Sequence, residues 1–168
     1  MNDLPPFAPW PHFDDDDVQV VSEVLRSGKV NQWTGHHVKA FEDEFAAFHD
    51  VNHAVAVANG TNAIEIALEA LGIGAGDEVV VTPRTFLASA SAVIRVGAKP
   101  VFADVDADSG NITAATVAPV LTDRTKAVLC VHLAGWPVDV DPIVDLVRPR
   151  GIKVVEDAAQ AHGAVYKG

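Results

Sequence analysis

The first fifty residues carry apolar positions at helical spacing. Four aspartates, residues 14–17, precede an apolar-periodic run that ends at Gly28. Carboxylates stabilise a helix N-terminus and glycine often ends a helix, so the pattern predicts a helix between these two points. A second helix is predicted over residues 38–48, where three phenylalanines fall on one face at i, i+4 and i+7.

After residue 53 the pattern changes to short apolar runs that alternate with longer helical segments. The apolar runs predict strands at residues 54–58, 79–81, 100–102, 127–131 and 152–155. Helices are predicted between them, near residues 63–71, 87–96, 113–121 and 141–148. The strands are almost continuously apolar, which is typical of parallel strands covered by helices on both faces. The sequence therefore predicts an α/β fold with a mainly parallel sheet sandwiched by helices.

The segment before the first helix has a different character. Four prolines and two aromatic residues lie within positions 4–11. Proline fixes φ and lacks an amide donor, so residues 1–13 are expected to form an extended arm. Its aromatic side chains would pack on the domain or on a partner subunit; a mobile tail is the alternative.

Composition and charge narrow the functional class. The chain has 168 residues, of which 49% are hydrophobic, and a net charge of −11. Such a surface repels phosphate backbones and anionic lipids, so neither nucleic acid nor a membrane is an expected partner. The N-terminus does not resemble a signal peptide and no apolar run is long enough to span a bilayer. These features predict a cytoplasmic protein.

A glycine-containing turn follows the predicted strand 54–58. Asn59, Gly60, Thr61 and Asn62 precede a helix, so capping side chains and free helix-start amides are available to hold one phosphate. The turn is neither a P-loop nor a dinucleotide-binding motif, and an ordinary capped helix start is the alternative. The glycines at positions 72, 74 and 76 follow a helix and precede a strand, so they are expected to be structural.

Other polar and aromatic residues also follow predicted strands, where ligands bind in open α/β sheets. Glu156 and Asp157 end the last strand, and one of the two carboxylates is expected to face the ligand as a metal ligand, a general base or a partner of a protonated pyridine. A solvated strand end is the alternative. Phe86 would stack on a planar ring or pack in the core. His132 would touch a ligand or be a hydrogen-bonded core histidine.

Metal and hydrolase sites are not predicted. His49 and His53 are four residues apart but lack the glutamate of a metalloprotease motif. The single cysteine, Cys130, cannot build a thiolate zinc site, and no Gly-x-Ser-x-Gly motif offers a nucleophile.

Taken together, these residues resemble a known family. The chain is similar to the DegT/DnrJ/EryC1/StrS family of pyridoxal-phosphate (PLP)-dependent sugar aminotransferases, which have the aspartate-aminotransferase fold (fold type I). The resemblance runs over nearly the whole chain, in order and with consistent spacing. Its motifs are residues 33–35, 54–61, 76–79, 85–86, 131–132 and 156–163.

The resemblance implies roles for particular residues. Asp157 would bond the protonated ring nitrogen of PLP, Phe86 would stack on the ring and Gln160 would contact the ring hydroxyl. Residues that would hold the 5′-phosphate are Gly60, Thr61 and Asn62. Residues that would lie near the substrate are Thr34, Gly35 and His132. The substrate would be a nucleotide-linked keto-sugar, the amino donor glutamate and the assembly a homodimer.

The resemblance also implies what lies outside these residues. The Schiff-base lysine of the family is expected beyond Gly168, so no catalytic residue is assigned in this chain, and residues 14–168 would form an incomplete PLP-binding large domain that is inactive alone. Arg84 departs from the family pattern and would alter what the site accepts. Two alternatives stay open: a PLP-dependent sugar dehydratase of the same family, and a non-catalytic PLP-binding or sensor domain.

Overall fold

A computed structural model describes residues 10–168 and divides the chain into two compact units, Met1–Ala56 and Val57–Gly168. Most of the arm expected over residues 1–13 lies outside the described residues. Its described part, from Trp10 onward, belongs to no helix or strand, and the extended arm stays a prediction.

The first unit contains the two predicted helices, α1 (Asp15–Ser27) and α2 (His37–Phe48). The Asp14 carboxylate accepts a hydrogen bond from the Asp17 amide at 3.0 Å, and the Asp17 carboxylate accepts one from the Asp14 amide at 3.1 Å. This reciprocal cap satisfies amides that have no partner within the helix. Gly28 ends α1 with φ of 68°, so the start and stop signals of this helix are confirmed.

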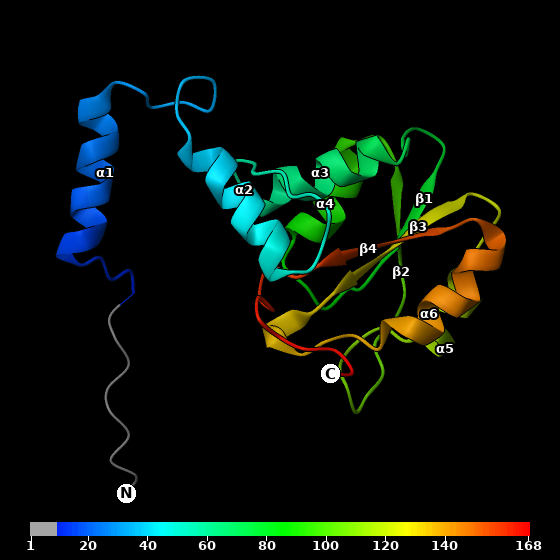
Figure 1. The fold of residues 1–168 in the computed structure, drawn as a ribbon. Helices are drawn as coiled ribbons and strands as arrows, with labels where there is room; N and C mark the ends of the chain where they lie inside the picture. Colours follow the sequence, from blue (N-terminus) through cyan, green and yellow to red (C-terminus); the bar gives the residue numbers. More distant parts are fainter. Residues whose placement is uncertain (1–9) are drawn as a thin grey trace, which may run out of the picture. The chain divides into compact units, whose positions relative to one another are not determined.

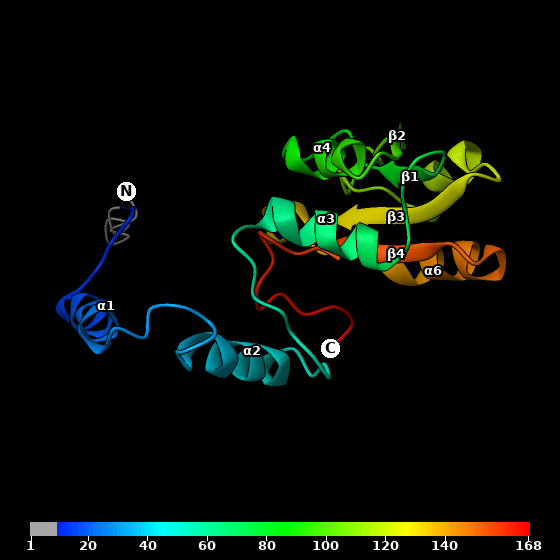
Figure 2. The same ribbon diagram turned by 90° about the horizontal axis from the view of Figure 1, so that it is seen from above.

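The second unit contains four parallel strands and the helices that connect them. In chain order they are α3 (Gly60–Ala70), β1 (Glu78–Val81), α4 (Ala88–Arg95), β2 (Lys99–Phe102), α5 (Ala114–Val117), β3 (Thr125–Val131), α6 (Val140–Val147) and β4 (Lys153–Asp157). The strand order is β2-β1-β3-β4, which Figure 2 shows from one edge of the sheet to the other. Short 3-10 turns lie at Ala118–Val120, Leu133–Gly135 and Arg148–Arg150.

Helices cover both faces of this sheet (Figure 1). Along β1, Val79 and Val81 pack with the apolar residues of α3 and α4, whereas Val80 packs with those of α5 and α6. All three valines are fully buried. The predicted α/β class with a parallel sheet between helices is therefore confirmed, and two buried faces explain why the strands are continuously apolar.

One predicted strand is wrong. Residues 54–58 form no strand, and nothing among residues 10–168 pairs with them in a ladder. The amide of Ala56 donates instead to the buried carboxylate of Glu42 at 2.9 Å. An apolar, β-branched run becomes a strand only when a neighbouring backbone accepts its hydrogen bonds, and here a side chain takes that place.

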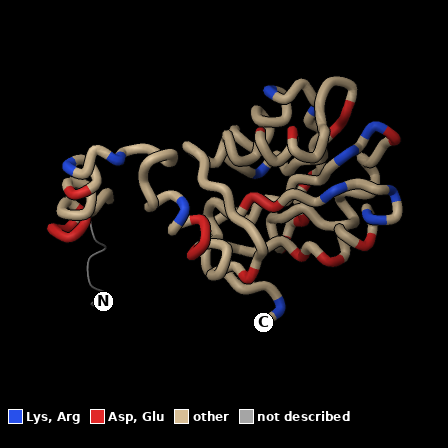
Figure 3. The backbone as a smooth tube through the Cα atoms, turned by 45° about the horizontal axis from the view of Figure 1, so that its top comes forward, with Lys and Arg blue, Asp and Glu red and all other residues tan. Residues whose placement is uncertain are grey.

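A buried carboxylate joins the strands at the end where they begin. Glu78, at the start of β1, is 2% exposed and accepts hydrogen bonds from Thr122 Oγ1 at 2.6 Å and from Arg124 Nη2 at 2.8 Å. Nζ of Lys99, at the start of β2, lies 3.4 Å from Glu78 Oε1. Figure 3 shows that blue segments, Lys and Arg, gather at this end of the sheet. The hydrogen bonds from Thr122 and Arg124 lower the pKa of Glu78 to about 2.

Within residues 10–168, no helix combines the length and the apolar character needed to cross a membrane.

Replacing Glu78 with glutamine should destabilise the intact protein at neutral pH and have little effect in acid. The pKa of Glu78 is about 2 in the folded protein and lies near 4.5 when unperturbed, so the carboxylate stabilises the fold fully above pH 4.5. That contribution disappears as the pH falls toward 2. Urea midpoints of wild type and Glu78→Gln, measured between about pH 7 and about pH 2, should converge in acid. Glu69→Gln, an exposed change on α3, is the matched control, and a Glu78→Gln difference that does not shrink in acid contradicts the prediction.

Candidate functional site

A cavity of about 300 Å³ lies within the second unit, where β1, β3 and β4 end and α3 and α4 begin. All the predicted cofactor residues except Asn62 line it, and His132 lines it too. Its walls are Asn59, Gly60, Thr61, Ile64, Thr85, Phe86, Ala88, Val131, His132, Leu133, Asp157, Ala159 and Gln160. The position at the carboxyl ends of the strands is the expected one for a ligand in an open α/β sheet.

The N-terminus of α3 forms one wall of the cavity. Asn59 caps the helix by accepting a hydrogen bond from the Asn62 amide at 3.0 Å. The amides of Gly60 and Thr61 come before that bond and are free, as first-turn amides are unless a ligand accepts from them. A Cβ added at Gly60 would meet nothing within 4 Å, so an anion can approach this backbone closely.

Asn62 faces a different surface. Its side-chain amide lies 3.5 Å from the Glu65 carboxylate, and its backbone amide is already used by the cap. Glu65 in turn pairs with Arg95 Nε at 2.5 Å. The structure therefore does not bring Asn62 to the cavity, and its role in phosphate binding stays a prediction.

Phe86 lies at the cavity wall and does not pack in the core, because 75% of its surface is exposed. An aromatic ring left this open in the wall of a cavity is a ready surface for a second planar ring.

The two carboxylates at the end of β4 point in opposite directions, as successive residues of a strand do. Asp157 faces the cavity, where its Oδ1 accepts from the Ala159 amide at 3.1 Å and its Oδ2 from Ser89 Oγ at 3.3 Å. Glu156 lies on the other face and pairs with His132.

His132 uses both ring nitrogens within the fold. Its Nδ1 accepts from the Val138 amide at 3.0 Å, and its Nε2 lies 2.9 Å from Glu156 Oε2. A backbone amide can only donate, so Nδ1 carries no proton and Nε2–H donates to the carboxylate. This hydrogen bond holds the pKa of Glu156 below its ordinary value, against the opposing effect of burial. Both ring nitrogens of His132 are thus engaged within the fold, although the residue lines the cavity, and its contact with a substrate stays a prediction.

Gln160 presents an amide group to the cavity. Its Oε1 accepts from the Ala134 amide at 2.8 Å, which leaves the NH₂ group as a donor for a ligand oxygen. Ala134 and Gly135 have positive φ of 56° and 79°, and this tight turn brings the Ala134 amide to the glutamine.

Thr34 and Gly35 belong to the first unit, in the turn between α1 and α2. The Thr34 amide donates to Asn31 Oδ1 at 3.2 Å. A Cβ at Gly35 would come within 2.9 Å of the Lys29 carbonyl oxygen, so the fold of this turn itself requires glycine. The roles of Thr34 and Gly35 near a substrate stay predictions.

Two further residues lie near the site without lining the cavity. Arg84 Nη1 donates to the Gly110 carbonyl at 3.1 Å, and the effect of Arg84 on what the site accepts stays a prediction. Ser89, which sequence reasoning missed, contacts Asp157 directly. Its position four residues after Thr85, on the helix that starts beside the cavity, is the signal that could have indicated it.

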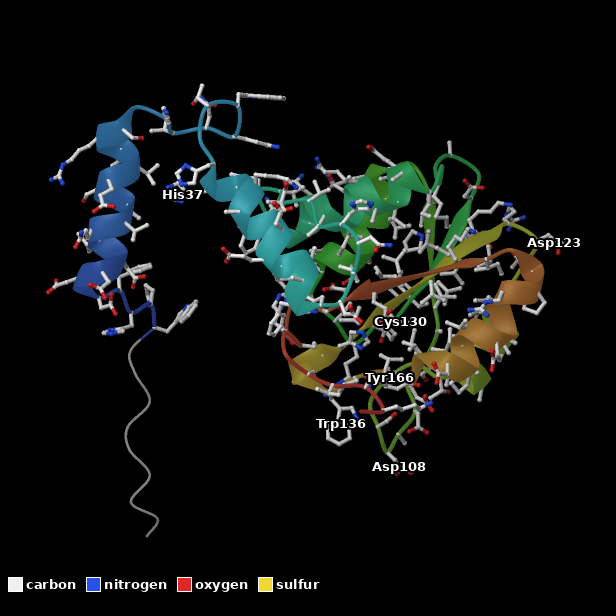
Figure 4. All side chains as sticks on the ribbon, viewed as in Figure 1. His37, Asp108, Asp123, Cys130, Trp136 and Tyr166 are labelled. Atoms are coloured by element: carbon white, nitrogen blue, oxygen red, sulfur yellow. The ribbon has the colours of Figure 1, made fainter. Side chains whose placement is uncertain are left out.

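The described residues offer no competing metal or thiolate site. Among residues 10–168, no group of three or more His, Cys, Asp or Glu side chains could hold a metal ion. Cys130 lies inside the second unit (Figure 4), and burial, with the nearby charge of Glu156, raises the pKa of its thiol to about 12.

The amino-acid sequence is similar to those of known aminotransferases and related enzymes. The profile of the DegT/DnrJ/EryC1/StrS aminotransferase family matches residues 11–168. A 3-amino-5-hydroxybenzoate synthase of Amycolatopsis mediterranei is 42% identical over 164 residues, which are 98% of this chain and 42% of that protein. A GDP-perosamine synthase of Caulobacter vibrioides is 41% identical over 169 residues, which are 100% of this chain and 45% of that protein.

The fold is also similar to solved structures of aminotransferases. The aminotransferase from Psychrobacter cryohalolentis superimposes with a TM-score of 0.94 and 56% identity, over 97% of this chain and 41% of that chain. NtdA from Bacillus subtilis, solved with bound cofactor PMP, gives a TM-score of 0.84 and 32% identity, over 89% of this chain and 35% of that chain.

The chain spans less than half the length of the curated relatives it matches, for example 40% of one and 45% of another. The family profile nevertheless matches almost all of its residues, and the fold and the cavity agree with the match. The chain belongs to the DegT/DnrJ/EryC1/StrS aminotransferase family.

Proposed function

We propose that this protein is a PLP-dependent aminotransferase that converts a keto group of a nucleotide-linked sugar to an amine. The observation that carries the proposal is the cavity in which a helix N-terminus, an exposed aromatic ring and a carboxylate meet. These three features match the phosphate, the ring and the ring nitrogen of PLP.

The residues of the cavity fit this cofactor one group at a time. The free amides of Gly60 and Thr61 would hold the phosphate, and the open face of Phe86 would pack on the ring. Asp157 would accept a hydrogen bond from the ring nitrogen and keep the proton there, while the Gln160 NH₂ group would donate to the ring hydroxyl. When bound, PLP supplies an electron-withdrawing ring that draws charge away from the bond that breaks.

The substrate and assembly are proposed from the family and its relatives. A GDP-perosamine synthase among the relatives supports a nucleotide-linked keto-sugar as the amino acceptor. Glutamate as the donor, a homodimer, a cytoplasmic location and contact of Thr34 and Gly35 with the substrate remain parts of this proposal. The lysine that would bind PLP covalently is expected beyond Gly168, and that expectation also stays a prediction.

Binding of PLP tests the cofactor assignment directly. Titration of the intact protein with PLP should give a saturable change in the absorbance of the cofactor. Asp157→Asn should weaken this binding about tenfold or more, because a charge-assisted hydrogen bond to the ring nitrogen is lost. Asp145→Asn, an exposed change on α6, should leave binding unchanged. If wild type does not bind PLP, or if Asp157→Asn binds it as tightly as wild type, the assignment is wrong.

Glutamate tests the reaction class on the same sample. Addition of glutamate to the PLP-loaded protein should convert the bound cofactor to pyridoxamine phosphate, which its absorbance reports. A protein that binds PLP without this conversion contradicts glutamate as the donor, and one that no amino donor converts is not an aminotransferase.

For His132 we propose a structural role that leads to a separate prediction. Replacing it with alanine leaves the amide of buried Val138 without its acceptor, so the free energy of unfolding should fall by about 1–3 kcal/mol. Hydrogen exchange of that amide should accelerate, as chemical denaturation and exchange experiments can measure. His53→Ala, at an exposed position, should change neither quantity. A slow Val138 amide in His132→Ala would contradict the proposed role.

A further inference from the structure

A buried hydroxyl stands behind the carboxylate of the candidate site. Ser89, in the first turn of α4, is 1% exposed and does not line the cavity. Its Oγ lies 3.3 Å from Asp157 Oδ2 and 2.8 Å from Thr85 Oγ1. Thr85 is itself part of the cavity wall, so the three side chains connect the start of α4 with the end of β4.

The chemistry of the three groups fixes the direction of the hydrogen bonds. An ionised carboxylate only accepts, so the single proton of Ser89 is directed to Asp157. Thr85 must then donate its own proton to Ser89 Oγ. The result is two consecutive hydrogen bonds that run in one direction, in which donation from Thr85 makes the Ser89 hydroxyl a stronger donor to Asp157.

These hydrogen bonds restrict rotation of the Asp157 carboxylate. The terminal torsion of an aspartate side chain is soft, so a carboxylate held on one oxygen can rotate. Here Oδ1 accepts from the Ala159 amide and Oδ2 accepts from Ser89, so both oxygens are held. The remaining lone pairs of Asp157 are available on the cavity side.

We propose that Ser89 is a positioning residue that aims Asp157 at the ring nitrogen of the cofactor, with Thr85 as its support. The proposal rests on the proposed function. Ser89 touches neither cofactor nor substrate, and it acts only through the orientation of Asp157.

A pair of ligands separates positioning from general stability. PLP has a ring nitrogen for Asp157, and the deaza analogue of PLP has a C–H group in its place. In the intact protein, Ser89→Ala should weaken PLP binding about tenfold and leave binding of the deaza analogue almost unchanged. Ser89→Thr, which keeps the hydroxyl, should restore PLP binding. Ser91→Ala is the matched control on the same helix, because within residues 10–168 the Ser91 hydroxyl donates to the Ala88 carbonyl alone, at 3.4 Å.

Each outcome supports or overturns the positioning role of Ser89. If Ser89→Ala weakens the binding of both ligands equally, the role of Ser89 is merely structural and the proposal is overturned. The proposal is also overturned if the binding of neither ligand is weakened. If Ser89→Ala does not fold, Thr85→Val takes its place and should give the same selective loss in smaller measure; no selectivity there overturns the proposal. A wild type that binds the deaza analogue and PLP equally well also overturns it. A wild type that binds neither ligand refutes the proposed function itself, which a selective failure of the serine variant does not.

Discussion

The alternation of side chains along β3 and β4 decides what the site contains. In a parallel pair, residues in register point to the same face, so Val131 and Asp157 both reach the cavity. Their neighbours Cys130 and Glu156 are also in register and share the opposite face. A shift of β4 by one residue would exchange the two carboxylates and leave the cavity without Asp157. The apolar packing on both faces of the sheet therefore matters to function, because it holds this register.

The sheet keeps its structural and its ligand-facing polar groups apart. At the end where the strands begin, Glu78 is buried and satisfied by Thr122 and Arg124, and it holds neighbouring strands together. At the carboxyl ends, the cavity instead offers open donors and acceptors, among them the Gly60 amide and the carboxylate of Asp157. A satisfied group stabilises a fold, whereas a group with spare hydrogen-bonding capacity is available to a ligand.

Periodicity predicted the helices, the four paired strands and the location of the site, because these depend on local spacing and on the geometry of parallel sheets. It failed for residues 54–58, because pairing needs a partner backbone that a local pattern does not contain. It also gave no indication of the direction of the Asn62 side chain, which lies near Glu65, itself paired with Arg95. Ser89 was missed because its spacing from Thr85 points to the site only once β4 is known to bring Asp157 beside it.

The single cysteine of the chain has a further consequence. Cys130 lies in the middle of the sheet, fully buried, with a thiol that stays protonated in neutral solution. A thiol reagent needs the thiolate and physical access, and the native state supplies neither. Modification of Cys130 therefore requires β3 to separate from its neighbours. The rate of modification by a thiol reagent reports the opening of the sheet, and no cysteine has to be introduced for this.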